Sequence, residues 1–440
     1  MKRPVVPPPP RWDFPTPRTL RLDNGLGVLL FPRPGQHLVN ATLVLELPLS
    51  SEPRDREGVS AILQRCLDEG TAAHPGTDFA DELESCGAVL TGGTGYGAAH
   101  LGLEVPSTRF GAALPLFAEA VREPQLAETD VRRHVELRLA ELAQEEAHPA
   151  HRGAIAFRAS VVDRDFRASR STAGEASGVS LITAADVRAQ HQAHYGPGRG
   201  TLVLSGDFGD DPLPAVLDAF ADWEQPTAPV VHEVPRAAPP RALLIDRPGA
   251  VQADVRVGRF GLDRRHPDYA ALRLGGFVLG GGFLSRLNRV LREERGYTYG
   301  VQLANTPART GGLMAMHASF RTEVAVAAIA EASELVRVDG DRAITGAELT
   351  DAVNFLVGIA PLRCATASGI SDQVAALIEA GLDSDFVNAH ATALRRITPD
   401  EATAAIERHL PPDDLSLVVV GDAEALADPL RTLGFQLDLG

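Results

Sequence analysis

The chain has 440 residues, a hydrophobic fraction of 44% and a charged fraction of 23%, which are typical of a globular protein with two to four domains. Its formal net charge of −16 at pH 7 argues against a nucleic-acid partner, because affinity for phosphate backbones comes mainly from Lys and Arg. Lys2 is the only lysine, which excludes a P-loop lysine, a Schiff-base lysine and a Ser–Lys dyad.

The sequence favours a cytoplasmic protein without a membrane partner. No apolar run approaches the roughly 18 residues of a membrane span. Residues 1–14 form a proline-rich tail that lacks the apolar core of a signal peptide. The three cysteines form no CxxC motif and are odd in number, so a disulfide framework is not expected.

The predicted elements mix strands and helices along the whole first half. Short apolar runs predict strands at 18–22, 28–31, 43–47, 101–105 and 202–204, and Asn24-Gly25 predicts a tight turn between the first two. Apolar residues at helical spacing predict helices at 58–69, 110–121 and 128–146. The proline-rich residues 225–241 predict a linker.

A repeat divides the chain into two halves. Ile-Thr, an acidic residue, Pro and a closing Gly-Asp occur in the same order in segments 182–207 and 397–422, and all corresponding residues are 215 positions apart. Two homologous halves that each mix strands and helices predict an α+β fold with two similar domains, at residues 15–224 and 242–440.

No complete catalytic set is evident. The zinc motifs HExxH and HxxEH and the GxSxG elbow are all absent. The pairs His148/His151 and His191/His194 are spaced i, i+3 but lack a correctly placed glutamate. We expect them to be surface or packing histidines.

The segment from Gly58 to Thr71, GVSAILQRCLDEGT, resembles the zinc-site helix of the insulinase, pitrilysin and mitochondrial processing peptidase family. In that family the motif HxxEH lies between a Gly and a closing Gly-Thr. The resemblance implies that the first histidine falls on Ala61, the general-base glutamate on Gln64 and the second histidine on Arg65. The family's third ligand, a glutamate, corresponds to Glu141, which lies 76 positions after Arg65.

These replacements predict a site that cannot hold zinc. Ala61 has no donor atom, and Arg65 is a permanent cation that would repel Zn²⁺. Gln64 is an amide without a basic lone pair to take a proton from water. Glu141 alone cannot hold the metal, so no cofactor is expected in this chain.

The second half resembles the C-terminal domain of the same family, in HPDYAAL at 266–272 and LGGGFLSRLNRVLREERGYTYGV at 279–301. The resemblance implies that Arg292 and Tyr299, spaced R-x6-Y, bind substrate beside a zinc site. A guanidinium can grip a carbonyl or carboxylate through its fork of donors, and a phenol can stabilise an oxyanion. Alternatively, Arg292 is a solvated helix charge and Tyr299 an ordinary strand aromatic, with Arg295 and Tyr297 as competitors.

Two glycine clusters have alternative interpretations. Gly280–Gly282 either allow a close approach to substrate or turn the chain before a helix, and we favour the turn. A phosphate-binding loop is a weaker interpretation of the same glycines. Gly93–Gly97 either leave room for a peptide at a sheet edge or mark a bulge.

The resemblance implies half of a clam-shell chamber and a zinc-free subunit of a heterodimeric peptidase. An HxxEH-bearing partner would supply zinc, water and base, and this chain would contribute Arg292 and Tyr299 to a site that cleaves unfolded peptides. The rival hypothesis is a non-enzymatic structural or peptide-binding protein, like the core subunits of respiratory complexes. A third is the maturation of one dedicated peptide.

Overall fold

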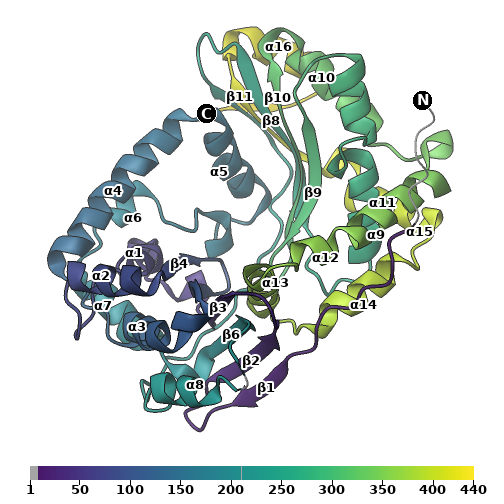
Figure 1. Ribbon diagram of the computed structural model, residues 1–440. Coiled ribbons are helices and arrows are strands. Elements are labelled where there is room, and N and C mark those ends of the chain that lie inside the picture. Colours follow the sequence, from purple (N-terminus) through teal and green to yellow (C-terminus); the bar gives the residue numbers. More distant parts are fainter. Residues whose placement is uncertain (1–7, 210) are drawn as a thin grey trace.

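Two six-stranded sheets form the framework of the protein, one from each half of the chain (Figure 1). The computed structural model describes residues 8–209 and 211–440. The strand order is β1-β2-β6-β3-β5-β4 in the first sheet and β12-β7-β11-β8-β10-β9 in the second. Helices pack on both sheets, so the predicted α+β class with two similar domains is confirmed.

The two sheets share a hydrogen-bonding pattern in five of their six strands and differ in the remaining edge pair, which is antiparallel for β1–β2 and parallel for β12–β7. One inner pair in each, β2–β6 or β7–β11, is parallel, and the next three strands run antiparallel. The strands of the first sheet are β1 (Arg18–Arg21), β2 (Gly27–Pro32), β3 (Leu38–Leu45), β4 (Val89–Thr94), β5 (Ala99–Pro106) and β6 (Gly200–Gly206). Those of the second are β7 (Ala242–Asp246), β8 (Gln252–Gly261), β9 (Val301–Pro307), β10 (Gly312–Arg321), β11 (Ser416–Gly421) and β12 (Leu437–Leu439).

The helices of the first half are α1 (Val59–Arg65), α2 (Thr77–Cys86), α3 (Phe110–Arg122), α4 (Glu128–Ala147), α5 (Pro149–Val161), α6 (Ala176–Val179), α7 (Ala184–His194) and α8 (Leu213–Phe220). Those of the second half are α9 (Tyr269–Gly276), α10 (Thr322–Leu335), α11 (Gly346–Gly358), α12 (Ala360–Arg363), α13 (Ala367–Glu379), α14 (Asp385–Leu394), α15 (Pro399–His409) and α16 (Ala423–Thr432). Two π-helical segments, η6 (Phe277–Gly281) and η7 (Asn288–Glu294), precede β9.

The sequence repeat encodes a repeated helix start. Thr183 and Asp186 form a capping box at the start of α7, in which each side chain bonds the other residue's backbone N–H. Thr398 and Glu401 form the same box at the start of α15. Because a capping box satisfies two otherwise unpaired donors of the first turn, these repeated residues have a structural role.

The two domains exchange one helix each. α5, from the first half, packs on β8 and β11 of the second sheet, whereas α13, from the second half, packs on β3 and β6 of the first (Figure 1). Two small apolar clusters fill these contacts: Phe14, Phe31, Val203, Cys364, Ile370 and Val374 in one, and Phe157, Val161, Val162, Ile245, Val418 and Val420 in the other. The exchange holds the domains together, because each sheet buries one face against a helix of the other half.

Two connecting segments cross between the domains. Residues 8–17 run along the second domain before β1, where the backbone N–H of Phe14 donates to Asn388 Oδ1 of α14 at 2.8 Å (Figure 1). The predicted linker, 225–241, has an isolated bridge at Ala237, and His232 is hydrogen-bonded to Glu46 at 2.8 Å. Residues 1–7 of the predicted tail lie outside the described residues.

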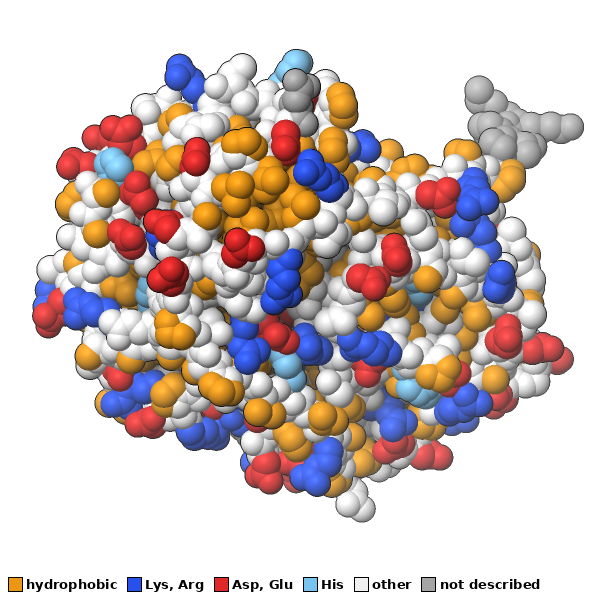
Figure 2. All heavy atoms as spheres, turned by 90° about the horizontal axis from the view of Figure 1, so that it is seen from below, with side chains coloured by type: hydrophobic (Ala, Val, Ile, Leu, Met, Phe, Trp, Pro, Cys, Tyr) orange, Lys and Arg blue, Asp and Glu red, His pale blue; other side chains and the backbone are white. Residues whose placement is uncertain are grey.

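Contrary to the expectation from the sequence, one described helical stretch, Gly340–Arg363, is long and apolar enough to cross a membrane by length and composition. In the folded chain it consists of a short helical turn, α11 and α12. Leu349 and Ala352 of α11 belong to the core of the second domain, and α11 packs on α9 and α14. This packing favours a helix of a folded domain. Figure 2 shows basic and acidic side chains interspersed around hydrophobic side chains on the face seen from below.

Candidate functional site

Helix α1, where the resemblance puts the family's zinc-site helix, begins at a backbone conformation that favours glycine. Gly58 has φ +104°, and a Cβ there would lie 2.8 Å from the backbone oxygen of Ala173. The buried Glu52 carboxylate accepts from the backbone N–H groups of Gly58 and Ser60 at 3.3 and 3.0 Å, and Arg167 pairs with it at 3.0 Å. These contacts fix the start of α1.

Arg65 and Glu141 form a bidentate ion pair between α1 and α4. Arg65 Nη1 and Nη2 donate to Oε1 and Oε2 of Glu141 at 2.8 and 2.7 Å. Arg65, followed by Arg138, lowers the pKa of the Glu141 carboxyl to about 2 against the opposing effect of burial. The structure thus brings together two residues 76 positions apart, at the places where the resemblance puts two zinc ligands.

The ion pair is part of a longer row of charges on α4. Arg138 donates to Glu141 at 3.1 Å and to both carboxylate oxygens of Glu145 at 2.8 and 3.1 Å. His151 Nε2 lies 3.0 Å from Glu145. Two arginines, two glutamates and a histidine therefore alternate from α1 to the start of α5.

Gln64 faces the interior of the first domain. Its amide nitrogen donates to the hydroxyl of Tyr195, which is fully buried, and the pKa of Tyr195 is raised by that burial. Its Oε1 would lie 2.7 Å from a Cβ at Gly92, so β4 needs a glycine opposite this side chain. The amide is held in place by contacts with its own domain.

These residues do not fit a zinc ion. Ala61 offers no donor atom, and the guanidinium of Arg65 occupies the carboxylate of Glu141 with both of its bonds. Zinc sites are built from Cys, His and carboxylate ligands, of which Glu141 alone remains here. The positive charge of Arg65 takes the place of a metal in holding α1 to α4.

Arg292 and Tyr299 lie on the second domain. Arg292 is in η7, its guanidinium carbon is 3.8 Å from the ring centroid of Phe283, and its Nη2 donates to Glu293 at 2.7 Å. Tyr299 is 96% exposed, in the loop before β9. The alternative that Tyr299 is an ordinary strand aromatic is therefore wrong, because strand pairing begins two residues later, at Val301.

The structure does not bring the two sets of residues together. η7 packs on β9 and α10, whereas α1 packs on α4, α7, β4 and β5. Arg292 and Tyr299 thus lie on elements of the second domain, and Arg65 and Glu141 lie on elements of the first. Whether they bind substrate stays a prediction.

Asn288, which the sequence analysis missed, holds the region around Arg292. Its buried amide donates to the backbone oxygens of Gly282 and Val301 at 3.1 and 2.9 Å and accepts from the Val301 N–H at 2.9 Å. One side chain thus joins the loop before η7 to the first residue of β9. Asn288 follows Leu287 and Leu284 at helical spacing in the amphipathic run LSRLNRVL, and an Asn beside that apolar face is the signal that could have identified it.

Both glycine clusters make room for neighbouring elements. A Cβ at Gly280 would lie 2.5 Å from Cβ of Leu303, so this glycine lets η6 lie close against β9. Gly95 and Gly97 follow the edge strand β4, and the Gly97 N–H donates to Glu379 of α13 at 3.2 Å. A Cβ at Gly95 would collide with that carboxylate. Helix packing therefore explains these positions within the chain.

The paired histidines have structural roles where they are buried. His191 Nε2 is hydrogen-bonded to the backbone oxygen of Val121 at 2.8 Å, and its ring lies 4.9 Å from that of Tyr195. Burial lowers the pKa of both His191 and His194. This matches the expected packing role.

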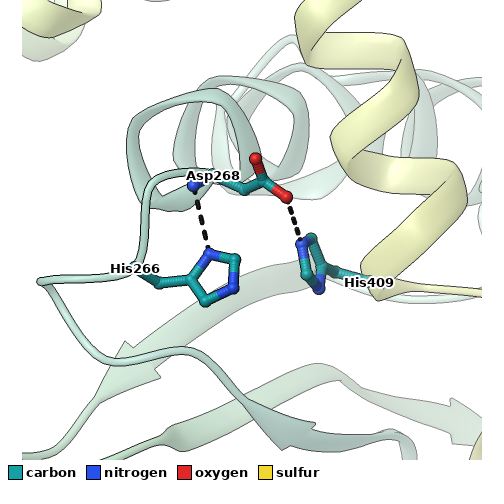
Figure 3. A group of neighbouring side chains, drawn as sticks. All are labelled: His266, Asp268 and His409. Atoms are coloured by element: carbon teal, nitrogen blue, oxygen red, sulfur yellow. Dashed lines mark hydrogen bonds and ion pairs between the residues drawn. The ribbon is translucent and has the colours of Figure 1, made fainter.

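One further group of potential metal ligands exists among the described residues: His266, Asp268 and His409 (Figure 3). His409 Nε2 lies 2.7 Å from Asp268 Oδ2, and the Asp268 backbone N–H donates to His266 Nδ1 at 3.1 Å. Arg408 also donates to that carboxylate oxygen, which is therefore already shared by two donors. We interpret this cluster as a link between the loop before α9 and the end of α15.

Two family models match the chain: Insulinase (Peptidase family M16) at residues 28–169, and Peptidase M16 inactive domain at residues 181–354. The structure of a peptidase M16 inactive domain from Pseudomonas fluorescens is 25% identical with a TM-score of 0.83, and the alignment covers 92% of this chain and 98% of that one. An uncharacterized zinc protease of Mycobacterium tuberculosis is 26% identical over 317 residues, 70% of this chain and 71% of the relative.

A third similar protein is named as a non-peptidase. The non-peptidase homolog YmxG of Helicobacter pylori is 22% identical over 377 residues, which is 85% of this chain and 86% of the relative. The matched models cover both halves of the chain, and the repeated domains and the paired positions of Arg65 and Glu141 agree with them. The chain belongs to the insulinase family of peptidases.

Proposed function

We propose that this chain is the zinc-free subunit of a heterodimeric metallopeptidase that cleaves unfolded peptides. The observation that carries the proposal is the Arg65–Glu141 ion pair, which joins the two positions where the family resemblance puts metal ligands. With no zinc ligand set and an amide at position 64, a metal and a general base would have to come from another chain. That partner would be a homologous subunit with an intact HxxEH motif.

The second domain would supply substrate contacts to the partner's site. Tyr299 is 96% exposed, so its hydroxyl is available to a second molecule. The Arg292 guanidinium is held against Phe283, which restricts its motion while most of its donors remain free. A phenol and a guanidinium placed in this way could bind a peptide carbonyl and stabilise the oxyanion formed during hydrolysis.

The names of similar proteins fit this division. Several relatives are named zinc proteases, whereas the Helicobacter pylori relative is named a non-peptidase homolog. The Pseudomonas fluorescens structure is titled an inactive domain. A family that includes both types can supply a catalytic chain and a non-catalytic chain to one complex.

The test is to purify the tagged chain from its host, identify any co-purifying HxxEH protein, and assay the complex on unfolded peptides. We expect Arg292→Ala and Tyr299→Phe each to lower kcat by about 10²-fold or more, as loss of an oxyanion donor does. Arg289→Ala is the matched control, since that arginine lies in the same segment, is exposed and pairs only weakly. Full activity of both variants in an active complex would refute the proposed roles.

The alternative is a non-enzymatic structural or peptide-binding protein. The homolog named as a non-peptidase is the observation that favours it. It predicts a homodimer, or a complex without any HxxEH subunit, that binds peptides without hydrolysing them. Mass spectrometry of the purified complex separates the two hypotheses.

A further inference from the structure

A cavity in the second domain is lined by three arginines and by no carboxylate. It has a volume of about 350 Å³ and lies between α9, α14, α12 and the end of β9. Arg264, Arg273 and Arg363 contribute to its wall, and we call it the arginine pocket. The chain as a whole carries 58 acidic and 42 basic residues. A wall with three arginines and no carboxylate therefore differs from the acidic composition of the chain.

Arg273 is held without a counter-charge. Its Nη1 donates to Nε2 of His390 at 2.8 Å. The pKa of His390 is lowered to about 3, first by burial and then by the charges of Arg273 and Arg264, so the imidazole is neutral. Burial also lowers the pKa of Arg273 itself; Tyr269 opposes this effect, whereas Arg363 and Arg264 add to it. A largely buried guanidinium thus has only uncharged neighbours, His390 and Tyr269, as partners, which is costly unless an anion joins it.

The other two arginines are available to a ligand. Within residues 8–209 and 211–440, neither the Arg264 nor the Arg363 side chain makes a hydrogen bond or ion pair. Gln373, on α13, is also without a side-chain hydrogen bond there and lines the same cavity. The two guanidinium groups and the amide add further donors to those of Arg273.

Much of the remaining wall is aromatic and aliphatic, and Asn305, Thr306 and Asn388 add polar groups to it. His390 lies between Tyr269 and Phe386, with ring centroids 5.1 and 5.3 Å away. Trp12 and Leu394 also line the cavity. A ligand that fits this lining has a charged end for the arginines and an apolar or aromatic body for the remaining wall.

We propose that the arginine pocket binds a small organic anion whose carboxylate or phosphate group is gripped by Arg264, Arg273 and Arg363. The planar fork of a guanidinium matches both oxyanions and can bind either through two parallel bonds. The ligand's apolar body packs against Tyr269 and Phe386. The site is independent of the proposed peptidase partnership, because residues of this chain alone, from the second domain and the N-terminal segment, line it.

Calorimetric titration of the full chain tests the proposal with phenyl phosphate, benzoate, inorganic phosphate and the neutral benzyl alcohol. We expect phenyl phosphate or benzoate to bind more tightly than benzyl alcohol, and the double variant Arg264→Ala/Arg363→Ala to weaken that binding at least about tenfold, since charge-assisted bonds are lost. Preference for phenyl phosphate assigns a phosphate head, and preference for benzoate assigns a carboxylate.

Matched variants separate the pocket from general charge effects. Arg247→Ala/Arg289→Ala removes two exposed arginines elsewhere and should leave binding unchanged. Arg273→Lys keeps the charge but loses the fork, and should weaken binding while circular dichroism confirms folding. Anion binding that is equal in both double variants, absent in the wild type, or no tighter than that of benzyl alcohol would overturn the proposal.

Discussion

A zinc site should be restorable by two substitutions, Ala61→His and Arg65→His. These positions lie one turn apart on the partly exposed side of α1. Glu141 already reaches position 65, since its carboxylate oxygens lie 2.7 and 2.8 Å from the Arg65 nitrogens. Two imidazoles and one carboxylate are a known ligand set of catalytic zinc. We expect the double variant to bind one zinc ion per chain.

The energies decide whether the variant folds. The ion pair with Arg65 is the main cause that lowers the pKa of Glu141 from 4.5 to about 2. This shift corresponds nominally to about 3 kcal/mol of folding free energy. Its side chain is 41% exposed, however, so loss of the pair should cost only about 1 kcal/mol or less. Zinc at a hundred times its Kd should add about 2.7 kcal/mol to the free energy of unfolding of the double variant. For a domain of about 200 residues, Tm should then rise by about 5–10 °C from chelator to zinc.

Equilibrium dialysis followed by metal analysis measures the zinc content, and calorimetry with zinc or chelator measures Tm. The wild type and the variant that also carries Glu141→Gln serve as controls, and we expect neither to gain stability from zinc. A double variant that is folded by circular dichroism but binds no more zinc than the wild type would refute the correspondence between these residues and the family's ligands.

Three further predictions concern stability. Thr183→Ala and Thr398→Ala each remove a capping box and should cost about 1 kcal/mol in denaturant unfolding, additively because they lie in different domains. Arg167→Ala leaves the buried Glu52 carboxylate without its cation and should cost about 3–5 kcal/mol, more than the conservative Glu52→Gln; equal costs would contradict this. His390 has a folded pKa of about 3 against 6.5 unfolded, so protonation favours the unfolded chain, and stability should fall as pH drops from about 6.5 towards 3. His390→Asn should remove that part of the acid-induced Tm loss; an unchanged pH profile would show that the histidine is not neutral in the fold.

The local features of the fold were predictable because the residues that determine them are neighbours in sequence. The capping residues at 183 and 398 and the Asn24-Gly25 turn act within a few positions. Helix α4 followed from its apolar spacing. The nearness of Arg65 and Glu141 followed from the family resemblance, since no local rule links residues 76 positions apart.

The long-range features were not predictable from one sequence. Periodicity shows which face of α5 or α13 is buried but not which sheet covers it, so the helix exchange was missed. The two hydrogen bonds between Asn288 of η7 and Val301 of β9 join separate elements, and no local pattern predicts them. The arginine pocket is assembled from six separate segments of the chain, so the absence of carboxylates from its wall becomes visible only in the folded structure.

The contrast between the two candidate regions supports a division of roles between chains. In α1, where the resemblance puts the zinc-site helix, Arg65 pairs with the carboxylate of Glu141. This ion pair joins α1 to α4 without a metal. Tyr299 has no such folding role, because a side chain that is 96% exposed buries almost no area against its own domain. Tyr299→Phe should therefore leave the Tm unchanged, whereas Arg65→Ala should lower it slightly. If Tyr299→Phe destabilises the isolated chain, this residue serves the fold, and the argument for a contact with a second chain fails.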